Sequence, residues 1–333
     1  MSLTDRPNAR PLEGVSVVEF AGVGPAPMCA MLLADMGAKV LRIERLHGVE
    51  LGTKREPRHN VHLRGRETLT LDLKRADAVA AALEGVSEAD LLIEGFRPGV
   101  MERLGLGPDV CLARNPALVF GRMTGWGQSG PLAGAAGHDL NYIALTGALA
   151  AIGRNGEAPA VPLNVVGDYG GGALYLAMGL LAALVRARTT GCGQVVDAAI
   201  VDGTLSLMGL HYGALAAGTW NLERGTNVID SGAPFYDVYE CADGQWVPVA
   251  ALERRFFVEL FQRLGMEASA FPDHLDRSHW VQMRLLLSGT FKSKTRAQWC
   301  AILEGSDACF APVLTMAEAH SHPHIAARQA LID

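Results

Sequence analysis

The sequence predicts an α/β fold with a large domain built on a mostly parallel sheet and a second, smaller α+β domain. Two observations predict it. From Val15 to Met123, short runs rich in branched residues alternate with helix-like stretches, the pattern of strand–helix–strand units. After residue 234 the pattern changes to a hairpin followed by helices, which is typical of an α+β domain.

The first third of the chain contains most of the expected strands. "VSVVEF" begins the series, a helix is expected from about Ala26 to Gly37, and an Ala-rich helix covers Arg75 to Glu84. Because a strand, a helix and a strand follow one another, we expect a parallel, Rossmann-like sheet. The expected strands cover residues 15–20, 39–43, 67–73, 90–96 and 117–123.

Helices dominate the middle of the chain. A helix is expected after Asp139, a long one at 170–188 and another at about 198–217. A hairpin with its turn at 242–244 then precedes a mostly helical stretch, 254–303. We therefore expect a large domain at 1–198, a linker helix and extended segment at 199–234, and a small domain at 235–315.

Composition excludes several classes of protein. The 333 residues are 49% hydrophobic and 19% charged, and the net charge of -6 argues against a nucleic-acid partner held by bulk charge. Six cysteines without a CxxC pair favour a reducing, cytoplasmic location. The longest apolar run, Ala173 to Val185, is short for a membrane span, so we interpret it as a buried helix and expect no membrane partner.

The segment "AGVGPAP" after the first strand is similar to a nucleotide-binding glycine loop, with Glu44 at the spacing of a ribose-binding acid. Pro27 stands where that pattern requires Gly or Ala, and Pro25 and Pro27 lack N–H donors for phosphate. We therefore favour a tight turn that starts a helix, and an NAD-linked oxidoreductase is a less favoured alternative.

Several residues are candidates for a site. Arginine suits phosphate recognition, and arginines recur in loops of the first hundred residues, although each is equally well explained as a solvated surface charge. His138 and Asp139 stand at an expected helix start, where Asp139 alone is most simply a cap. Asp168 lies among glycines before the long helix, as a cap or a catalytic group.

The segment "HSHPH" brings His320, His322 and His324 close together. Pro323 and the lack of a cysteine or acidic partner argue against a metal site, so we expect no metal.

Taken in order, several segments resemble the α-methylacyl-CoA racemases of the family III CoA-transferase superfamily. They are "GHDLNYIALTGAL", "PLNVVGDYGGGALY", "GQVVDAAIVDGT", "SGAPFYDVYECADGQWVPVAALE" and "DACFAPVLT". The similarity runs from about residue 12 to about residue 325. It implies the family III CoA-transferase fold and a homodimer of interlocked chains. Members continue further, so residues 316–333 would be the start of a truncated return segment.

The resemblance also implies roles for residues. His138 and Asp168 correspond to the acid/base pair, and Glu253 to the glutamate that partners the histidine, supplied by the other chain of the dimer. Asp139 is expected to act chiefly through its backbone N–H. Residues expected to bind CoA are Arg45, Arg64, Arg66, Arg97, Arg103 and Tyr142. Arg64 and Arg66 fall in the loop that matches the basic "RGKR" segment of the family, which reads "RGRE" here.

The resemblance implies racemisation of 2-methylacyl-CoA thioesters by proton transfer through an enolate, and no cofactor beyond the CoA of the substrate. Two titratable groups of different type suit proton transfer on opposite faces of one carbon. One alternative is a CoA-transferase with Asp168 as nucleophile, disfavoured because no GGGGQP-type loop is present and the histidine is. A CoA-binding protein without activity is a further alternative.

Overall fold

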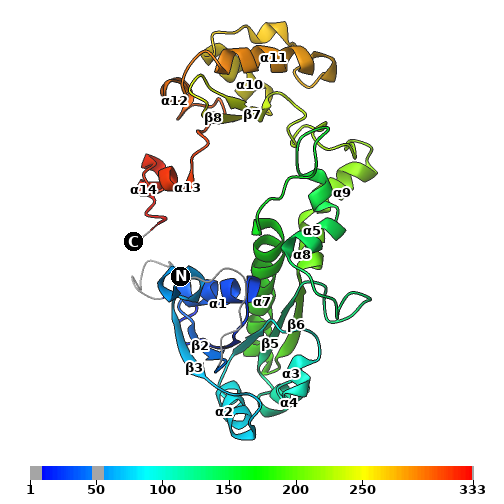
Figure 1. Ribbon diagram of the computed structural model, residues 1–333, viewed down its shortest axis with the longest axis vertical. Coiled ribbons are helices and arrows are strands. Elements are labelled where there is room, and N and C mark those ends of the chain that lie inside the picture. Colours follow the sequence, from blue (N-terminus) through cyan, green and yellow to red (C-terminus); the bar gives the residue numbers. More distant parts are fainter. Residues whose placement is uncertain (1–9, 47–55, 332–333) are drawn as a thin grey trace. The chain divides into compact units, whose positions relative to one another are not determined.

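The computed structural model describes residues 10–46 and 56–331, which form two compact units (Figure 1). The first unit consists of the chain up to Leu149 and of Val161–Ala214. The second unit consists of Ala150–Ala160 and of the chain from Leu215 onward. The division differs from the expected boundaries in two places. Residues 199–214 belong to the first unit, and a loop from the middle of the chain belongs to the second.

The first unit is built on a six-stranded parallel sheet, which confirms the predicted fold class. The strands are β1 (Ser16–Phe20), β2 (Lys39–Glu44), β3 (Arg66–Thr70), β4 (Leu91–Glu94), β5 (Val119–Thr124) and β6 (Gln194–Ala199). Their order is β3-β2-β1-β4-β5-β6. The strand β6 is not among the expected strands, because it runs directly into the next helix with no glycine or proline between them.

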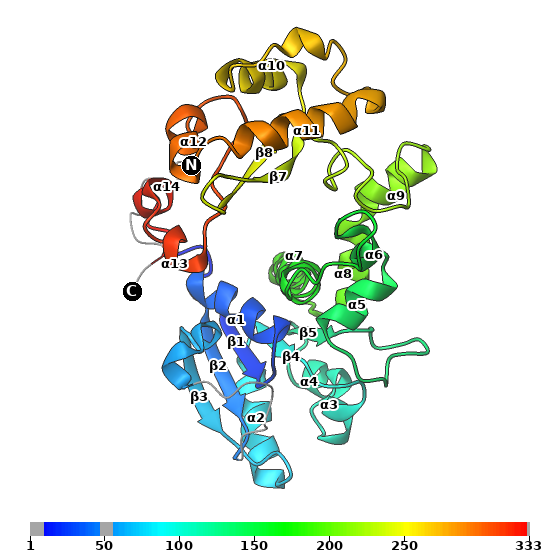
Figure 2. The same ribbon diagram turned by 45° about the horizontal axis from the view of Figure 1, so that its top comes forward.

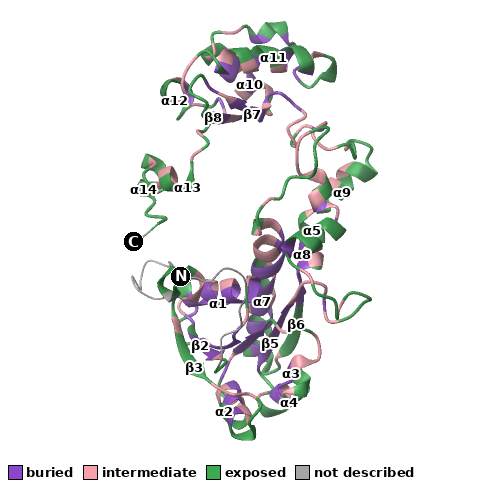
Figure 3. Ribbon diagram, in the orientation of Figure 1, coloured by how far each residue is buried: buried purple, intermediate pink, exposed green. Residues whose placement is uncertain are grey.

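Helices cover both faces of the sheet (Figure 2). On one face, Val17 and Ile93 pack with α1 (Pro25–Asp35) and α7 (Leu174–Thr190). On the other face, the neighbouring residues Val18 and Leu92 pack with α2 (Ala76–Ser87) and α4 (Pro108–Arg114). The central strands β1, β4 and β5 are therefore buried on both sides, whereas the edge strand β3 and most of β6 are exposed and green in Figure 3. Burial on both sides explains the continuous apolar runs of the central strands.

The turn into α1 has the form expected from its prolines. Gly24 adopts a φ of 68°, and Pro25 occupies the first helical position. The remaining helices of this unit or its boundary are α3 (Val100–Arg103), α5 (Asp139–Leu145), α6 (Ala148–Ala151), α8 (Ile200–Leu207) and α9 (Gly209–Ala216).

The long helix differs from the expectation at its start. A π-helical segment, Val165–Ala173, precedes α7, and Gly191 ends the helix with a φ of 73°. Among the described residues, the run Val165–Thr190 is long and apolar enough to cross a membrane. Half of its most apolar window is buried inside the structure, and core helices of soluble proteins meet the same criterion.

The second unit contains the predicted hairpin, β7 (Tyr236–Glu240) and β8 (Trp246–Ala250). Its helices α10 (Arg254–Arg263), α11 (Trp280–Phe291) and α12 (Arg296–Leu303) enclose a core rich in aromatic side chains. Phe257 and Phe261 stack at 4.2 Å, and Tyr239 stacks on Phe291 at 5.2 Å. Two short helices follow, α13 (Met316–Ala319) and α14 (Pro323–Ala327).

Candidate active site

A cavity of about 420 Å³ lies at the carboxyl ends of the central strands. The strands β1 and β4 are neighbours, but the chain leaves them toward opposite edges of the sheet. Such a switch point leaves a crevice outside the strand ends, where α/β proteins bind ligands. Loops that follow β1, β4 and β5 line the cavity, namely Val23–Pro25, Gly95–Pro98 and Met123–Trp126.

His138 lines this cavity as the residue that caps the N-terminus of α5. Its main-chain N–H donates to Asn141 Oδ1 at 3.0 Å, and its side chain is exposed. The preceding carbonyl, that of Gly137, accepts a hydrogen bond from the hydroxyl of Tyr142. The Tyr142 ring packs edge-on against Trp126 at 4.7 Å. Tyr142, expected to bind CoA, therefore lines the cavity and also holds the loop that carries His138.

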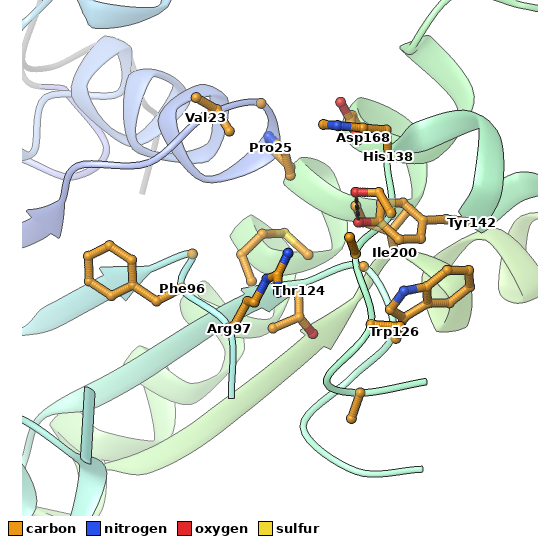
Figure 4. A pocket seen from close by; sticks show the side chains of 18 of the residues that line it. Val23, Pro25, Phe96, Arg97, Thr124, Trp126, His138, Tyr142, Asp168 and Ile200 are labelled. Atoms are coloured by element: carbon orange, nitrogen blue, oxygen red, sulfur yellow. Dashed lines mark hydrogen bonds between the residues drawn. The ribbon is translucent and has the colours of Figure 1, made fainter. Parts of the chain in front are cut away.

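Asp168 lines the same cavity from the π-helical segment. It lies inside this segment, whose N-cap is Asn164, so the alternative that Asp168 is a helix cap is wrong. Asn164 Nδ2 donates to Asp168 Oδ2 at 3.2 Å. Burial raises the pKa of the Asp168 carboxyl, Asp139 raises it further, and Asn164 and His138 oppose the shift. Figure 4 shows Asp168 and His138 together at one edge of the cavity.

Asp139 is buried, with 7% of its surface exposed, directly after the exposed His138. Its Oδ1 accepts the main-chain N–H of Asp168 at 2.6 Å. Its Oδ2 is buried without a hydrogen-bond partner among the described residues, and burial raises the pKa of this carboxyl. The side chain of Asp139 therefore positions Asp168. The role expected for Asp139, which used only its backbone N–H, did not include this contact.

Two glycines allow the two aspartates to fit. A Cβ at Gly167 would lie 2.5 Å from Asp139 Oδ1, and a Cβ at Gly24 would lie 3.2 Å from Asp168 Oδ2. Only a residue without a side chain permits the first approach without a shift of neighbouring atoms.

Two of the expected CoA-binding arginines are exposed near the cavity. Arg97 lines it, and the Arg45 guanidinium lies 5.2 Å above the ring of Phe96, another lining residue. Phe96 and Arg45 also line a neighbouring cavity of about 610 Å³, together with Lys74. Phe96 is thus a wall of both cavities, and both have cationic side chains in their lining. Arg103 is exposed in α3, and its guanidinium lies close to Gly99: a Cβ added to this glycine would be 3.1 Å from Arg103 Nη1.

The other two arginines are paired with carboxylates. Arg64 is half-exposed and bonded to Asp35. Arg66 has 1% of its side chain exposed, and its Nε donates to the fully buried Glu19 at 2.5 Å. Its two Nη groups donate to the carbonyls of His62 and Pro27. The expectation that Arg66 binds CoA is corrected here, because its donors are used inside the protein.

Glu253 belongs to the second unit, whereas His138 and Asp168 belong to the first. It follows β8 as the N-cap residue of α10, and its side chain is exposed. Its carbonyl accepts the N–H groups of Phe256 and Phe257, each at 3.0 Å.

Residues 12–333 match the family described as CoA-transferase family III. The chain belongs to CoA-transferase family III. It is 44% identical over 321 residues to the alpha-methylacyl-CoA racemase of Mus musculus, covering 96% of this chain and 82% of that protein. It is 42% identical to the Homo sapiens protein of the same name, covering 94% and 80%. The structure of a CAIB/BAIF family protein from Brucella suis shares the fold, with a TM-score of 0.81, 24% identity, and coverage of 98% and 90%.

Within this family III chain, the structure adds residues that sequence reasoning had not selected. Asn164 bonds to Asp168, and Trp126 and Phe96 form walls of the cavity. Asn164 precedes Asp168 by four residues, a spacing that places two side chains on one side of a helical segment. Phe96 and Trp126 each follow the end of a strand, and this position is the feature of the sequence that points to them.

The histidines near the end of the chain have other partners. His322 Nε2 lies 2.8 Å from Glu304 Oε1, and His320 Nδ1 lies 2.8 Å from the carbonyl of Ala317. Across residues 10–46 and 56–331, no three His, Cys, Asp or Glu side chains gather as metal ligands.

Proposed function

We propose that this family III chain is an isomerase that racemises 2-methylacyl-CoA thioesters, with His138 and Asp168 as its two acid/base groups. The observation that carries the proposal is that these two titratable side chains line one cavity at the switch point of the sheet. The names of the mouse and human relatives support the same activity.

The reaction needs one group to take the α-proton and another to return a proton on the opposite face. In one direction the Asp168 carboxylate takes the proton and becomes neutral, and the His138 imidazolium gives its proton to the α-carbon. The roles reverse for the other enantiomer. The raised pKa of Asp168 suits this task, because a base is most effective when its pKa approaches the working pH.

The intermediate enolate places negative charge on the thioester oxygen. The N–H of Asp139 stands in the first turn of α5, where main-chain donors have no partner within the helix. We assign it as a donor to this oxygen, and one such donor is worth about 3 kcal/mol in the transition state.

The anionic part of CoA is proposed to follow the surface that contains Arg97, Arg45 and Lys74, along the two cavities that share Phe96. Arg103 and Arg64 are exposed and complete the proposed phosphate-binding set, and Arg64 would exchange its bonds to Asp35 for the phosphate. The proposal requires no cofactor beyond this CoA. Glu253 is proposed to reach His138 from the second chain of an interlocked homodimer, where it would stabilise the imidazolium as the acid of a catalytic triad does.

The six cysteines are free, which is compatible with the proposed cytoplasmic location. The runner-up function is a CoA-transferase in which Asp168 forms a mixed anhydride with the acyl group. Incubation of one enantiomer of a 2-methylacyl-CoA in D₂O distinguishes the two. Racemisation predicts α-deuteration with epimerisation, whereas transfer of CoA to an added free acid, with the α-proton retained, would establish the transferase.

A further inference from the structure

The second unit contains a cavity of its own, of about 790 Å³, between the Ala150–Ala160 loop, β7 and α11. All of its lining residues belong to this unit. Its polar lining includes Arg154, Arg284, Lys292, Ser231, Ser288 and Asp237.

Two arginines in this cavity share one carboxylate. The Asp237 side chain is 1% exposed; its Oδ1 accepts from Arg154 Nη1, and its Oδ2 accepts from Arg284 Nη1. Oδ1 also accepts the N–H of Val238 at 2.7 Å. Two positive charges therefore meet a single negative charge at this part of the wall.

The donors of the two guanidinium groups are used unequally. Arg284 Nη2 donates to the carbonyls of Ser231 and Gly232 at 2.7 and 2.8 Å. Within the described part of the chain, Nε and Nη2 of Arg154 make no hydrogen bond, and 43% of this side chain is exposed. Burial and the charge of Arg154 lower the pKa of Arg284, which is the effect expected of a positive charge that is incompletely neutralised.

The other charged side chains of the lining are Lys292, Glu240 and Glu157, which bring its formal charge to zero, so the two arginines form the part of the wall that attracts an anion. Lys292 Nζ is paired with Glu240 at 2.7 Å, which is neutral overall. Glu157 is exposed on the loop, where water screens its charge. Ser231 is held at a φ of 74°, a left-handed conformation that is strained for a residue with a side chain. The hydrogen bond from Arg284 to its carbonyl contributes to holding Ser231 at the cavity.

We propose that this cavity binds a phosphate group, either inorganic phosphate or a phosphomonoester. The free donors of Arg154 would hold it, the paired guanidinium groups of Arg154 and Arg284 would attract it, and the hydroxyl groups of Ser231 and Ser288 would complete its hydrogen bonds. The site lies in the second unit and does not depend on the proposed racemase activity.

The test is calorimetric titration of the full chain with inorganic phosphate at constant ionic strength. Ser288→Asp adds a negative charge to the cavity without removing a partner of Asp237. We expect saturable binding by the unmodified protein and binding at least about tenfold weaker in this variant, because a new charge within the cavity repels the anion. The matched control is Gln282→Asp, which adds the same charge at an exposed position of α11 outside the lining, and should bind phosphate normally.

Thermal unfolding of both variants checks that they fold. We expect both to fold, because neither Ser288 nor Gln282 bonds to Asp237. If neither inorganic phosphate nor CoA binds Ser288→Asp more weakly than it binds the unmodified protein, the proposal is overturned. The same titrations with CoA and with dephospho-CoA identify the source. A Ser288 dependence seen only with CoA assigns the phosphate to its 3′-phosphomonoester, and a dependence seen only with inorganic phosphate assigns the free ion.

Discussion

The carboxylate of Asp139 accepts a hydrogen bond of 2.6 Å from the main chain of Asp168. Asp139 follows His138 directly in sequence, so this one contact ties together the two segments that carry the proposed acid and base. The two groups must approach opposite faces of one carbon, and small errors in such geometry are costly to rate. We infer that Asp139 fixes the spacing of the pair.

Replacing Asp139 tests this inference. Asp139→Ala removes the acceptor of the Asp168 N–H, a loss of about 1–3 kcal/mol, so the racemisation rate should fall roughly 5- to 150-fold. Asp139→Asn keeps an oxygen at the same place and should retain more activity than the alanine variant. The measurement is kcat and KM for both variants. Equal loss in both would show that the hydrogen bond is not what matters.

The pH dependence of stability follows from the raised pKa of Asp168. The folded protein holds this proton more tightly than the unfolded chain does. The contribution to stability is therefore greatest below the pKa of the unfolded chain and is lost as pH rises through the pKa of the folded state. Asp168→Asn removes this titration, so its Tm should increase relative to the unmodified protein as pH rises above the ordinary aspartate pKa of about 4. A Tm difference that does not change with pH would contradict the shift.

Gly167 should not tolerate a side chain. A Cβ there would lie 2.5 Å from Asp139 Oδ1, so Gly167→Ala must displace the contact between the aspartates. We expect a destabilisation of about 1–3 kcal/mol and a lower kcat. Gly134→Ala is the control, because a Cβ at Gly134 meets nothing within 4 Å. Denaturant unfolding and steady-state kinetics measure both variants, and normal kinetics in Gly167→Ala would refute the tight fit.

Replacing Arg66 should lower the stability of the protein, whereas replacing Arg97 should weaken the binding of acyl-CoA. Arg66→Ala leaves Glu19 buried with Arg42 alone at 2.8 Å, and removing a partner from a buried ion pair costs about 3–5 kcal/mol. Arg97→Ala removes an exposed cation that lines the cavity, so it should raise KM for acyl-CoA and leave Tm unchanged. A large fall in Tm for Arg97→Ala, or none for Arg66→Ala, would reverse the assignments.

The sheet was largely predictable because β1, β2, β4 and β5 are buried runs bounded by turns. The strand β6 was not, since its residues continue into α8 without an interruption and their pattern merges with that of the helix. The π-helical segment was also missed, because its hydrogen-bond register leaves no distinct trace in the order of apolar residues.

Contacts between distant segments determine the parts of the site that sequence patterns do not predict. Arg66 resembles a phosphate-binding residue in sequence, and its partner Glu19 stands 47 residues earlier on another strand. Asp139 was selected for its N–H, while its carboxylate contacts a residue 29 positions away. His138 and Asp168 were selected by resemblance, and their common cavity follows from the sheet order, which sequence patterns leave open.

The most direct test of the two-base account is α-proton exchange in D₂O, measured for each enantiomer of a 2-methylacyl-CoA with His138→Ala and with Asp168→Ala. Each variant should lose racemisation severely. Each should still exchange the α-proton of one enantiomer, because the remaining base faces one side of the carbon, and the two variants should prefer opposite enantiomers. Wild-type racemisation in either variant, or the same enantiomer exchanged by both, would contradict the account.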